Sequence, residues 1–290
     1  PIYEVIKIAK SYINNHKLNQ KSVIGELSKV SSNIESSTEK HLLKNKFSKI
    51  IDLEYTGWTI IKLGDGYELI FQSGDSSPKY LPGHSHSDLL SFDLFFKGRP
   101  IFVEAGTSIY KNSIERKYER SGKSHNVLQV APFFERRDES FSNWIEPVEV
   151  WGSFRVAKKA KIIKRFSRAI SNNEFELKGS HDGFKKIGCL HERIINLKIN
   201  NEGKMIFNLR DRLQLDKKIK WRQWWHLGPE VGTEIKDRLI KAYMQNYQIP
   251  PELNQTWYSP RFGVRIPRKS ISFEGFFPPG NHEINISLEF

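Results

Sequence analysis

The sequence predicts a mainly β protein, a large multi-stranded antiparallel β-sandwich preceded by a short helical segment. Many short runs of Val, Ile, Phe, Tyr and Trp are separated by Gly, Asn and Asp, which is the pattern of strands joined by turns. The 19 Phe, 10 Tyr and 7 Trp residues supply much of the apolar surface for a core. Helical stretches between most strands, which a parallel α/β fold requires, are missing.

The first part of the chain has helical spacing instead. Ile2, Val5, Ile6 and Ala9 recur as on one face of a helix, and a second helical run is expected from Lys21 to Ile51. We therefore divide the chain into a helical segment, residues 1–52, and a β-sandwich domain, residues 53–290.

The strands of the second part are expected in a regular order. The Gly64-Asp65-Gly66 turn joins the first predicted hairpin, and Lys97 to Pro100 form the turn of the second. One helix, Glu234–Tyr247, interrupts the strands before Pro250-Pro251. The predicted strands are 58–63, 67–71, 90–96, 101–104, 126–130, 146–156, 161–169, 173–180, 192–199, 205–209, 220–227 and segments within 262–290.

The net charge of +13 favours an anionic partner, which can be a nucleic acid, an acidic lipid or an acidic polysaccharide. Nucleic acid ranks last, because the basic residues are dispersed rather than gathered into a stripe. Cys189 is the single cysteine, so no intrachain disulfide is possible. No signal peptide is recognised, and no apolar stretch approaches the roughly 20 residues that span a bilayer.

A group of histidines and acids gives the sequence its clearest chemistry. His84 and His86 are two residues apart, so on an extended chain they lie on the same side. Glu104 and His125 follow later, each next to a strand-like run. Two imidazoles and one carboxylate suit a divalent transition metal, most readily zinc. Each of these residues alone is equally well explained as an ordinary polar residue at a strand end.

The predicted hairpin gives a geometric reason for the group to meet. If strands 90–96 and 101–104 pair, Glu104 returns to the end of the sheet where His86 lies. His125 precedes a strand that we expect beside these two. We expect Asp88 and Asn126 to support the ligands, since a carboxylate such as Asp88 can accept the second N–H of a ligating histidine.

Further polar residues lie between Glu104 and His125. A tyrosine such as Tyr110 or Tyr118 can exchange a proton near a sugar. Arg116 and Arg120 can bind a carboxylate through two hydrogen bonds. The alternatives are packing at the sheet rim for the tyrosines and plain surface charge for the arginines.

Three motifs together resemble the C-terminal sheet domain of the heparinase II/III family of polysaccharide lyases. They are Gly-His-Ser-His-Ser-Asp-Leu-Leu-Ser-Phe from residue 83, Gly-Arg-Pro-Ile-Phe-Val-Glu-Ala-Gly-Thr-Ser-Ile-Tyr from residue 98, and Tyr-Glu-Arg-Ser-Gly-Lys-Ser-His-Asn-Val from residue 118. The resemblance implies a β-sandwich that follows an α/α toroid, with the substrate cleft between them. It implies that His84 faces the cleft, that Tyr110 lines it, and that His86, Glu104 and His125 hold a structural zinc ion.

Two departures from the family pattern stand out. The family usually has Asp where this chain has Glu104, and the toroid that supplies the principal catalytic Asn, Tyr and His would run for hundreds of residues before this region. We therefore expect the C-terminal part of a lyase that acts by β-elimination on a uronic-acid-containing acidic polysaccharide, inactive as this stretch alone. The resemblance implies a bacterial cell-envelope location, periplasmic or secreted. The alternative is a non-catalytic β-sandwich that binds acidic polysaccharide in cell-surface glycan assembly.

Overall fold

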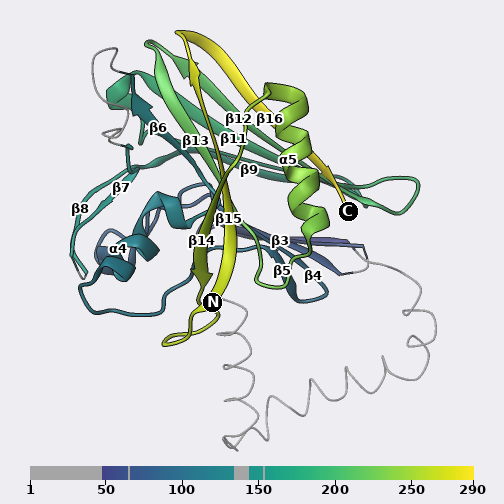
Figure 1. Ribbon diagram of the computed structural model, residues 1–290, viewed down its shortest axis with the longest axis horizontal. Helices are drawn as coiled ribbons and strands as arrows, with labels where there is room; N and C mark the ends of the chain where they lie inside the picture. The colour runs from purple at the N-terminus through teal and green to yellow at the C-terminus, as the bar shows by residue number, and fades with distance from the viewer. Residues whose placement is uncertain (1–47, 65, 134–143, 153) are drawn as a thin grey trace, which may run out of the picture. The chain divides into compact units, whose positions relative to one another are not determined.

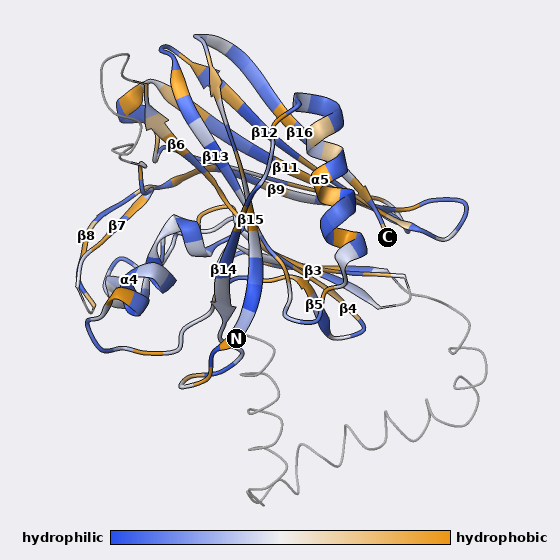
Figure 2. Ribbon diagram, in the orientation of Figure 1, coloured by the Kyte–Doolittle hydropathy of each residue, from blue (hydrophilic) through white to orange (hydrophobic). Residues whose placement is uncertain are grey.

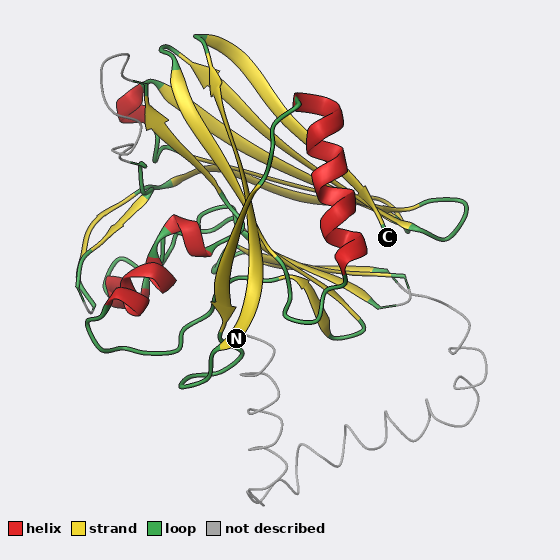
Figure 3. Ribbon diagram, viewed as in Figure 1, coloured by secondary structure: helices red, strands yellow, loops and turns green. Residues whose placement is uncertain are grey.

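Antiparallel strands make up most of the described residues, which in a computed structural model of the chain are 48–64, 66–133, 144–152 and 154–290 (Figure 1). The strands form three larger sheets and one two-stranded hairpin (Figure 3). The mainly β class predicted from the sequence is therefore confirmed, and the arrangement is consistent with a β-sandwich. The helices predicted before residue 48 lie outside the described residues and stay a prediction.

The first sheet has the strand order β1-β2-β3-β4-β5. The predicted helix to Ile51 is wrong at its end, because Lys49 to Ile51 belong to strand β1 and Ile50 pairs with Ile61 of β2. The hairpin around Gly64 to Gly66 is confirmed, with Leu63 opposite Tyr67. The strands are β1 (Lys49–Leu53), β2 (Trp58–Leu63), β3 (Tyr67–Gln72), β4 (Phe92–Phe96) and β5 (Arg99–Phe102).

The turn between β4 and β5 explains why the sequence encodes a hairpin here. Lys97 and Gly98 both have positive φ angles, 49° and 75°. A two-residue turn with positive φ at both positions matches the right-handed twist of the paired strands, and glycine adopts this conformation without a steric penalty. The turn brings the chain after β5 back toward the start of β4.

The second sheet has the order β16-β12-β11-β10-β9, and its strands alternate between buried and exposed residues. The alternation is visible as changing colour along the strands in Figure 2. In β12 the inward positions include Phe207 and Leu209, as the period-two pattern of a half-buried strand requires. The strands are β9 (Ile162–Ser171), β10 (Glu174–His181), β11 (Cys189–Ile199), β12 (Met205–Leu215) and β16 (Gly280–Glu289).

The third sheet has the order β14-β15-β13-β6, and it corrects one prediction. The strand after His125 does not lie beside β4 and β5, because β6 pairs with β13 instead. Strand β14 was not predicted, since its edge position leaves it partly exposed and without an apolar alternation. The strands are β6 (Leu128–Pro132), β13 (Ile219–His226), β14 (Glu252–Tyr258) and β15 (Ile266–Phe277), and the separate hairpin is β7 (Val148–Val150) with β8 (Val156–Lys159).

Two α-helices accompany the sheets in the described part of the chain. Helix α4 (Ile114–Arg120) begins after Ser113, whose side chain accepts a hydrogen bond from the Arg116 backbone N–H. Helix α5 (Thr233–Tyr247) was predicted within one residue. It buries Leu239 and Tyr243, and the Tyr243 ring stacks on Phe273 of β15 with centroids 3.4 Å apart.

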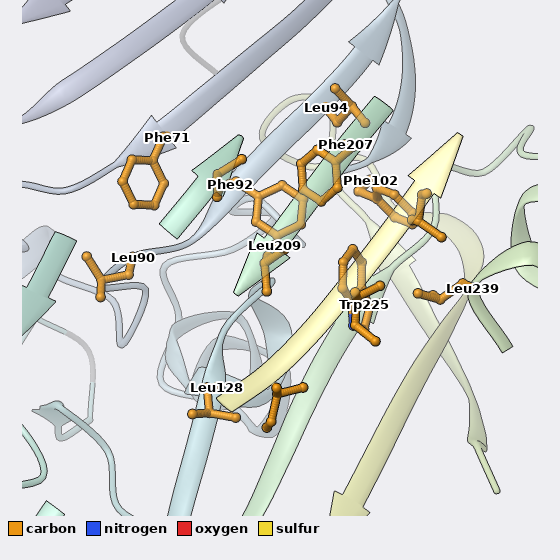
Figure 4. Close-up of a cluster of buried hydrophobic side chains, with 14 of the residues drawn as sticks. Phe71, Leu90, Phe92, Leu94, Phe102, Leu128, Phe207, Leu209, Trp225 and Leu239 are labelled. Atoms are coloured by element: carbon orange, nitrogen blue, oxygen red, sulfur yellow. The ribbon is translucent and has the colours of Figure 1, made fainter. Parts of the chain in front are cut away.

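Aromatic side chains from all three sheets meet in one core (Figure 4). Phe92 of the first sheet lies 5.2 Å from Phe207 of the second and 5.6 Å from Trp225 of the third, measured between ring centroids. Phe102 lies 5.0 Å from Trp225. Burial of each such ring contributes about 1.5–3 kcal/mol, so this cluster fixes how the sheets stack. No helix in the described residues is long and apolar enough to cross a membrane.

Candidate functional site

The segment from His84 to Asp88 is held in place by helix α4. Pro82 starts a short 3₁₀ turn that ends at His84, and the Ser85 backbone N–H closes it on the Pro82 carbonyl at 3.0 Å. The buried Arg120 side chain donates to the Ser85 carbonyl at 3.0 Å, and the Ser87 N–H donates to the Arg120 carbonyl at 2.9 Å. These bonds leave His84 exposed while His86 points into the protein.

Glu104 lies just beyond β5, where the chain leaves the first sheet. Its backbone N–H donates to the Asp93 carboxylate of β4 at 2.9 Å. The neighbouring Val103 N–H donates to His226 of the third sheet, and the Ala105 N–H donates to Ser124. The chain around Glu104 therefore connects two sheets and the loop before His125.

His125 reaches the site from this loop. The side chain of the next residue, Asn126, donates to the Phe92 carbonyl at 2.9 Å and accepts from the His226 N–H at 2.7 Å. Asn126 thus joins the first and third sheets directly beside His125. These bonds anchor the backbone beside His125, and the predicted support of a metal ligand by Asn126 stays a prediction.

The structure brings the three predicted metal ligands together. The His125 Nδ1 atom lies 3.0 Å from Glu104 Oε1, and the His86 and His125 ring centroids are 5.3 Å apart. Glu104 Oε1, both His125 ring nitrogens and Asp88 Oδ1 are buried, and none has a hydrogen-bond partner of good geometry within the described residues. Buried polar atoms are rarely left unsatisfied, so these atoms fit a site that binds a cation.

The three side chains lie close together but do not converge on one point as metal ligands do. Within ranges 48–64, 66–133, 144–152 and 154–290, no three His, Cys, Asp or Glu side chains have a geometry that could hold a metal ion. An Arg116 nitrogen lies 3.4 Å from His86 Nε2, so a cationic side chain already contacts one of the two ring nitrogens. The donor chemistry therefore fits zinc, and the metal site stays a prediction.

Burial and neighbouring charges set the protonation of this group. Burial, reinforced by His125 and Arg116, holds the pKa of His86 well below its usual value, so this ring is neutral. Burial also lowers the pKa of His125, but the adjacent Glu104 carboxylate outweighs it and raises the pKa overall. Burial raises the pKa of Asp88 to about 7.

The two predicted catalytic residues lie together at the surface. The His84 and Tyr110 ring centroids are 5.7 Å apart with an edge-on orientation. The Arg116 guanidinium lies 5.2 Å from the centre of the Tyr110 ring, so one arginine contacts both Tyr110 and His86. An exposed histidine and tyrosine beside a cation are suited to bind an anionic group and to move a proton.

The predicted substrate-binding residues on α4 lie deeper than expected. Arg116 and Arg120 are 2% and 1% exposed, although both line a cavity of about 220 Å³ together with Trp151. Tyr118 packs against Trp257 with ring centroids 4.6 Å apart. Direct contact of these three residues with a polymer stays a prediction. Arg120 holds the His84 segment through the Ser85 carbonyl, and Arg116 lies beside His86.

Sequence reasoning missed a buried polar cluster behind the site, which we call the Asp211 cluster (His181, His191, Arg193, Asp211 and Gln223). Asp211 accepts from His191 at 2.8 Å and from two Arg193 nitrogens at 2.7 Å each. Arg193 also donates to the carbonyls of Leu90 and Asn126, on both segments that carry site residues. A sequence signal was present, because the period-two pattern places His191 and Arg193 on the same face of β11 as Cys189 and Ile195.

Comparisons with known proteins agree with this architecture. A heparan sulfate lyase from Pedobacter heparinus aligns with 91% of this chain and 41% of its own, at 16% identity and a TM-score of 0.58. A heparinase III structure aligns with 84% of this chain and 37% of its own, at 15% identity and a TM-score of 0.56. The chain thus spans about two fifths of the length of these structures, and the likeness shows the fold.

A search of curated protein sequences gave no match. The family model described as heparinase II/III-like, C-terminal, matches residues 47–286, which is most of the chain. The match begins just before β1 and includes every site residue described above. The chain therefore belongs to the heparinase II/III-like C-terminal family.

Proposed function

We propose that this chain is the C-terminal domain of a polysaccharide lyase that cleaves a uronic-acid-containing acidic polysaccharide by β-elimination. The observation that carries the proposal is the placement of exposed His84 and Tyr110 close to half-buried His86 and Glu104 and buried His125. The fold of the family and the net charge of +13 support an acidic substrate. We place the protein in the bacterial cell envelope, periplasmic or secreted.

The chemistry sets what the residues have to do. A base removes the proton at C5 of the uronic acid, the bond from C4 to the glycosidic oxygen breaks, and a C4–C5 double bond forms. The leaving oxygen takes up a proton. Negative charge that develops on the uronate carboxylate is stabilised by hydrogen-bond donors and cations nearby. His84 neutralises this carboxylate or transfers a proton, and Tyr110 assists from 5.7 Å away.

A zinc ion would be held by His86, Glu104 and His125. When bound, it supplies a fixed positive charge that ties the three side chains together behind His84. The neutral state of His86 suits a ligand, since metal binding requires an unprotonated ring nitrogen. Glu104 stands where the family usually has an aspartate, and a glutamate carboxylate would also be able to hold zinc.

Turnover tests this proposal. The protein, with any sequence that its gene encodes upstream, is incubated with heparan sulfate, hyaluronan and alginate, and unsaturated products are followed by their ultraviolet absorbance. We expect His84→Ala to lower turnover by about 100-fold or more, as for loss of a general acid or base. Full activity of this variant would remove His84 from the mechanism.

Metal analysis is the independent second measurement. We expect about one zinc ion per chain by elemental analysis, and substantially less in His86→Ala. Binding of polysaccharide without unsaturated products, at every length of chain, would favour the non-catalytic binding domain instead.

A further inference from the structure

Four aromatic rings from four separate segments form an exposed cluster around His84. Tyr110 lies 5.7 Å from His84, 5.2 Å from Phe154 and 5.0 Å from Phe262, measured between ring centroids. Phe154 lies 5.3 Å from His84. Tyr110, Phe154 and Phe262 are 41%, 44% and 59% exposed, so each ring offers part of a face to solvent. We call these four residues the aromatic cluster.

Backbone contacts hold the outer rings in place. Gly106 has a φ of 72° and pairs with Ser259, where a side chain would collide with the Ser259 carbonyl. The Gly263 N–H donates to the Ser108 carbonyl at 2.9 Å, which fixes Phe262 beside Tyr110. These contacts position one edge of the cluster before any ligand arrives.

The Phe154 ring is positioned from the opposite side. Its Cβ packs against Gly83, where an added Cβ would lie only 3.1 Å away. Arg120 donates to the Trp151 carbonyl at 3.2 Å, which ties the turn that carries Phe154 to α4. The rings of the aromatic cluster are therefore held in fixed orientations by separate interactions on each side.

Each of the three non-histidine rings has an exposed cation next to it in the sequence. The pairs are Tyr110 with Lys111, Phe154 with Arg155, and Phe262 with Arg261. None of these three cations forms an ion pair with any residue that the structure describes. Other exposed cations are paired, as Arg168 is with Glu176 at 2.9 Å, so pairing is possible at this surface but is not made by these three. Each of these rings therefore has an exposed positive residue beside it along the chain, with no ion-pairing acid among the described residues.

We propose that the aromatic cluster, with Lys111, Arg155 and Arg261, is a binding subsite for an anionic sugar unit of the substrate. A sugar ring presents an apolar C–H face, which packs on aromatic rings, and charged substituents at its rim, which meet cations. An apolar protein partner would not require unpaired cations around the rings. The inference rests on the proposed function, because this sugar is a neighbour of the unit on which His84 acts.

Binding without turnover tests the subsite. The 290-residue chain is titrated calorimetrically with a heparan sulfate hexasaccharide, with a hyaluronan hexasaccharide, and with neutral cellohexaose, at low and at physiological salt. We expect both acidic probes to bind and cellohexaose not to bind. Phe262→Ala is expected to weaken binding about tenfold, as for loss of an aromatic contact residue, and Phe262→Trp to retain it. Arg261→Gln is expected to weaken binding about threefold and to reduce its salt dependence.

Matched variants separate a local effect from a general one. Phe276→Ala removes another exposed ring, near the far end of β15, and Arg168→Gln removes a paired cation of the second sheet; both should bind as the wild type does. Circular dichroism and thermal unfolding confirm the fold of every variant. Unchanged affinity of well-folded Phe262→Ala, equal binding of cellohexaose, or no binding of either acidic probe would overturn the subsite.

The two proposals fail independently. Loss of turnover in His84→Ala with unchanged binding in Phe262→Ala would leave the lyase and remove the subsite. Binding that depends on Phe262 without any turnover would leave the subsite and remove the lyase.

Discussion

Two buried polar clusters differ in how completely their hydrogen bonds are satisfied. In the Asp211 cluster, His181 accepts from the Gly183 N–H at 3.1 Å and contacts His191 at 3.3 Å, and Asp211 accepts from His191 and Arg193. In the Glu104 cluster (His86, Asp88, Glu104 and His125), several nitrogen and oxygen atoms have no partner of good geometry within the described residues. A satisfied network stabilises a fold, and an unsatisfied one is available to a ligand.

Arg193 connects the Asp211 cluster to the Glu104 cluster. Arg193 forms an ion pair with Asp211. It also donates hydrogen bonds to the backbone carbonyls of Leu90 and Asn126, which lie in the segments that carry the Glu104 cluster. The Asp211 cluster therefore acts as the support of the Glu104 cluster. The second sheet holds no predicted site residue, but through Arg193 it helps to position the site.

The largest effect is expected from Arg193→Met. This change leaves the Asp211 carboxylate buried without its main counter-ion and frees the carbonyls of Leu90 and Asn126. Loss of one partner of a buried ion pair costs about 3–5 kcal/mol, which urea denaturation measures as a lower free energy of unfolding. A loss below about 1 kcal/mol would show that the Asp211 cluster does not support the fold.

The next largest effect is expected on the pH dependence of stability, through buried His181 of the Asp211 cluster. Burial, together with His191 and Arg193, holds the pKa of His181 well below its usual value in the folded state. The unfolded chain binds a proton near pH 6.5, so the free energy of unfolding falls as the pH drops below about 6.5, by up to about 1.4 kcal/mol per pH unit from this group. His86 and His226 shift in the same direction and add to the slope, whereas the raised pKa values of His125 and Asp88 act in the opposite direction.

Urea denaturation between about pH 5 and pH 7.5 measures this slope. His181→Asn keeps an acceptor for the Gly183 N–H and removes the titrating ring, so the slope should become shallower. An equal slope in the variant would assign the acid sensitivity to other groups.

A smaller effect on stability is expected from Glu104→Gln in the metal-free protein. Glutamine keeps the shape of the side chain but loses the negative charge that lies 3.0 Å from His125 Nδ1, so the change should cost about 1–2 kcal/mol in urea denaturation. Zinc affinity should fall by at least about tenfold, measured by competition with a chromogenic chelator. A stability loss as large as that of Arg193→Met would make Glu104 a structural residue.

The smallest effect is expected from Arg168→Gln. Its ion pair with Glu176 lies at the surface, where the arginine side chain is 55% exposed. Exposed pairs contribute about 0–1 kcal/mol, and salt screens them. A change in the urea midpoint larger than that of Glu104→Gln would contradict the distinction between buried and exposed charge.

The site could be predicted from the sequence where short-range geometry decides it. Glu104 lies near the start of β4 because a tight turn at Lys97-Gly98 returns the chain, and turn chemistry is local. His125 was expected near Glu104 because the strand that follows it was predicted beside β4 and β5. This reason is wrong, since that strand, β6, pairs with β13 in the third sheet. His125 arrives through hydrogen bonds of Val103 and Ala105 to residues distant in the sequence, which no local pattern encodes.

The sequence by itself determined the strand class, most hairpins, the α5 helix and the residue types of the site, because period-two alternation, turn residues and motif spacing act over few residues. Only the tertiary structure decided that Arg116 and Arg120 are buried, that Arg193 supports the site, and that Phe154 contacts His84 while Phe262 contacts Tyr110. These outcomes depend on how three sheets stack around one aromatic core. Such stacking is set by the packing of side chains from all parts of the chain at once.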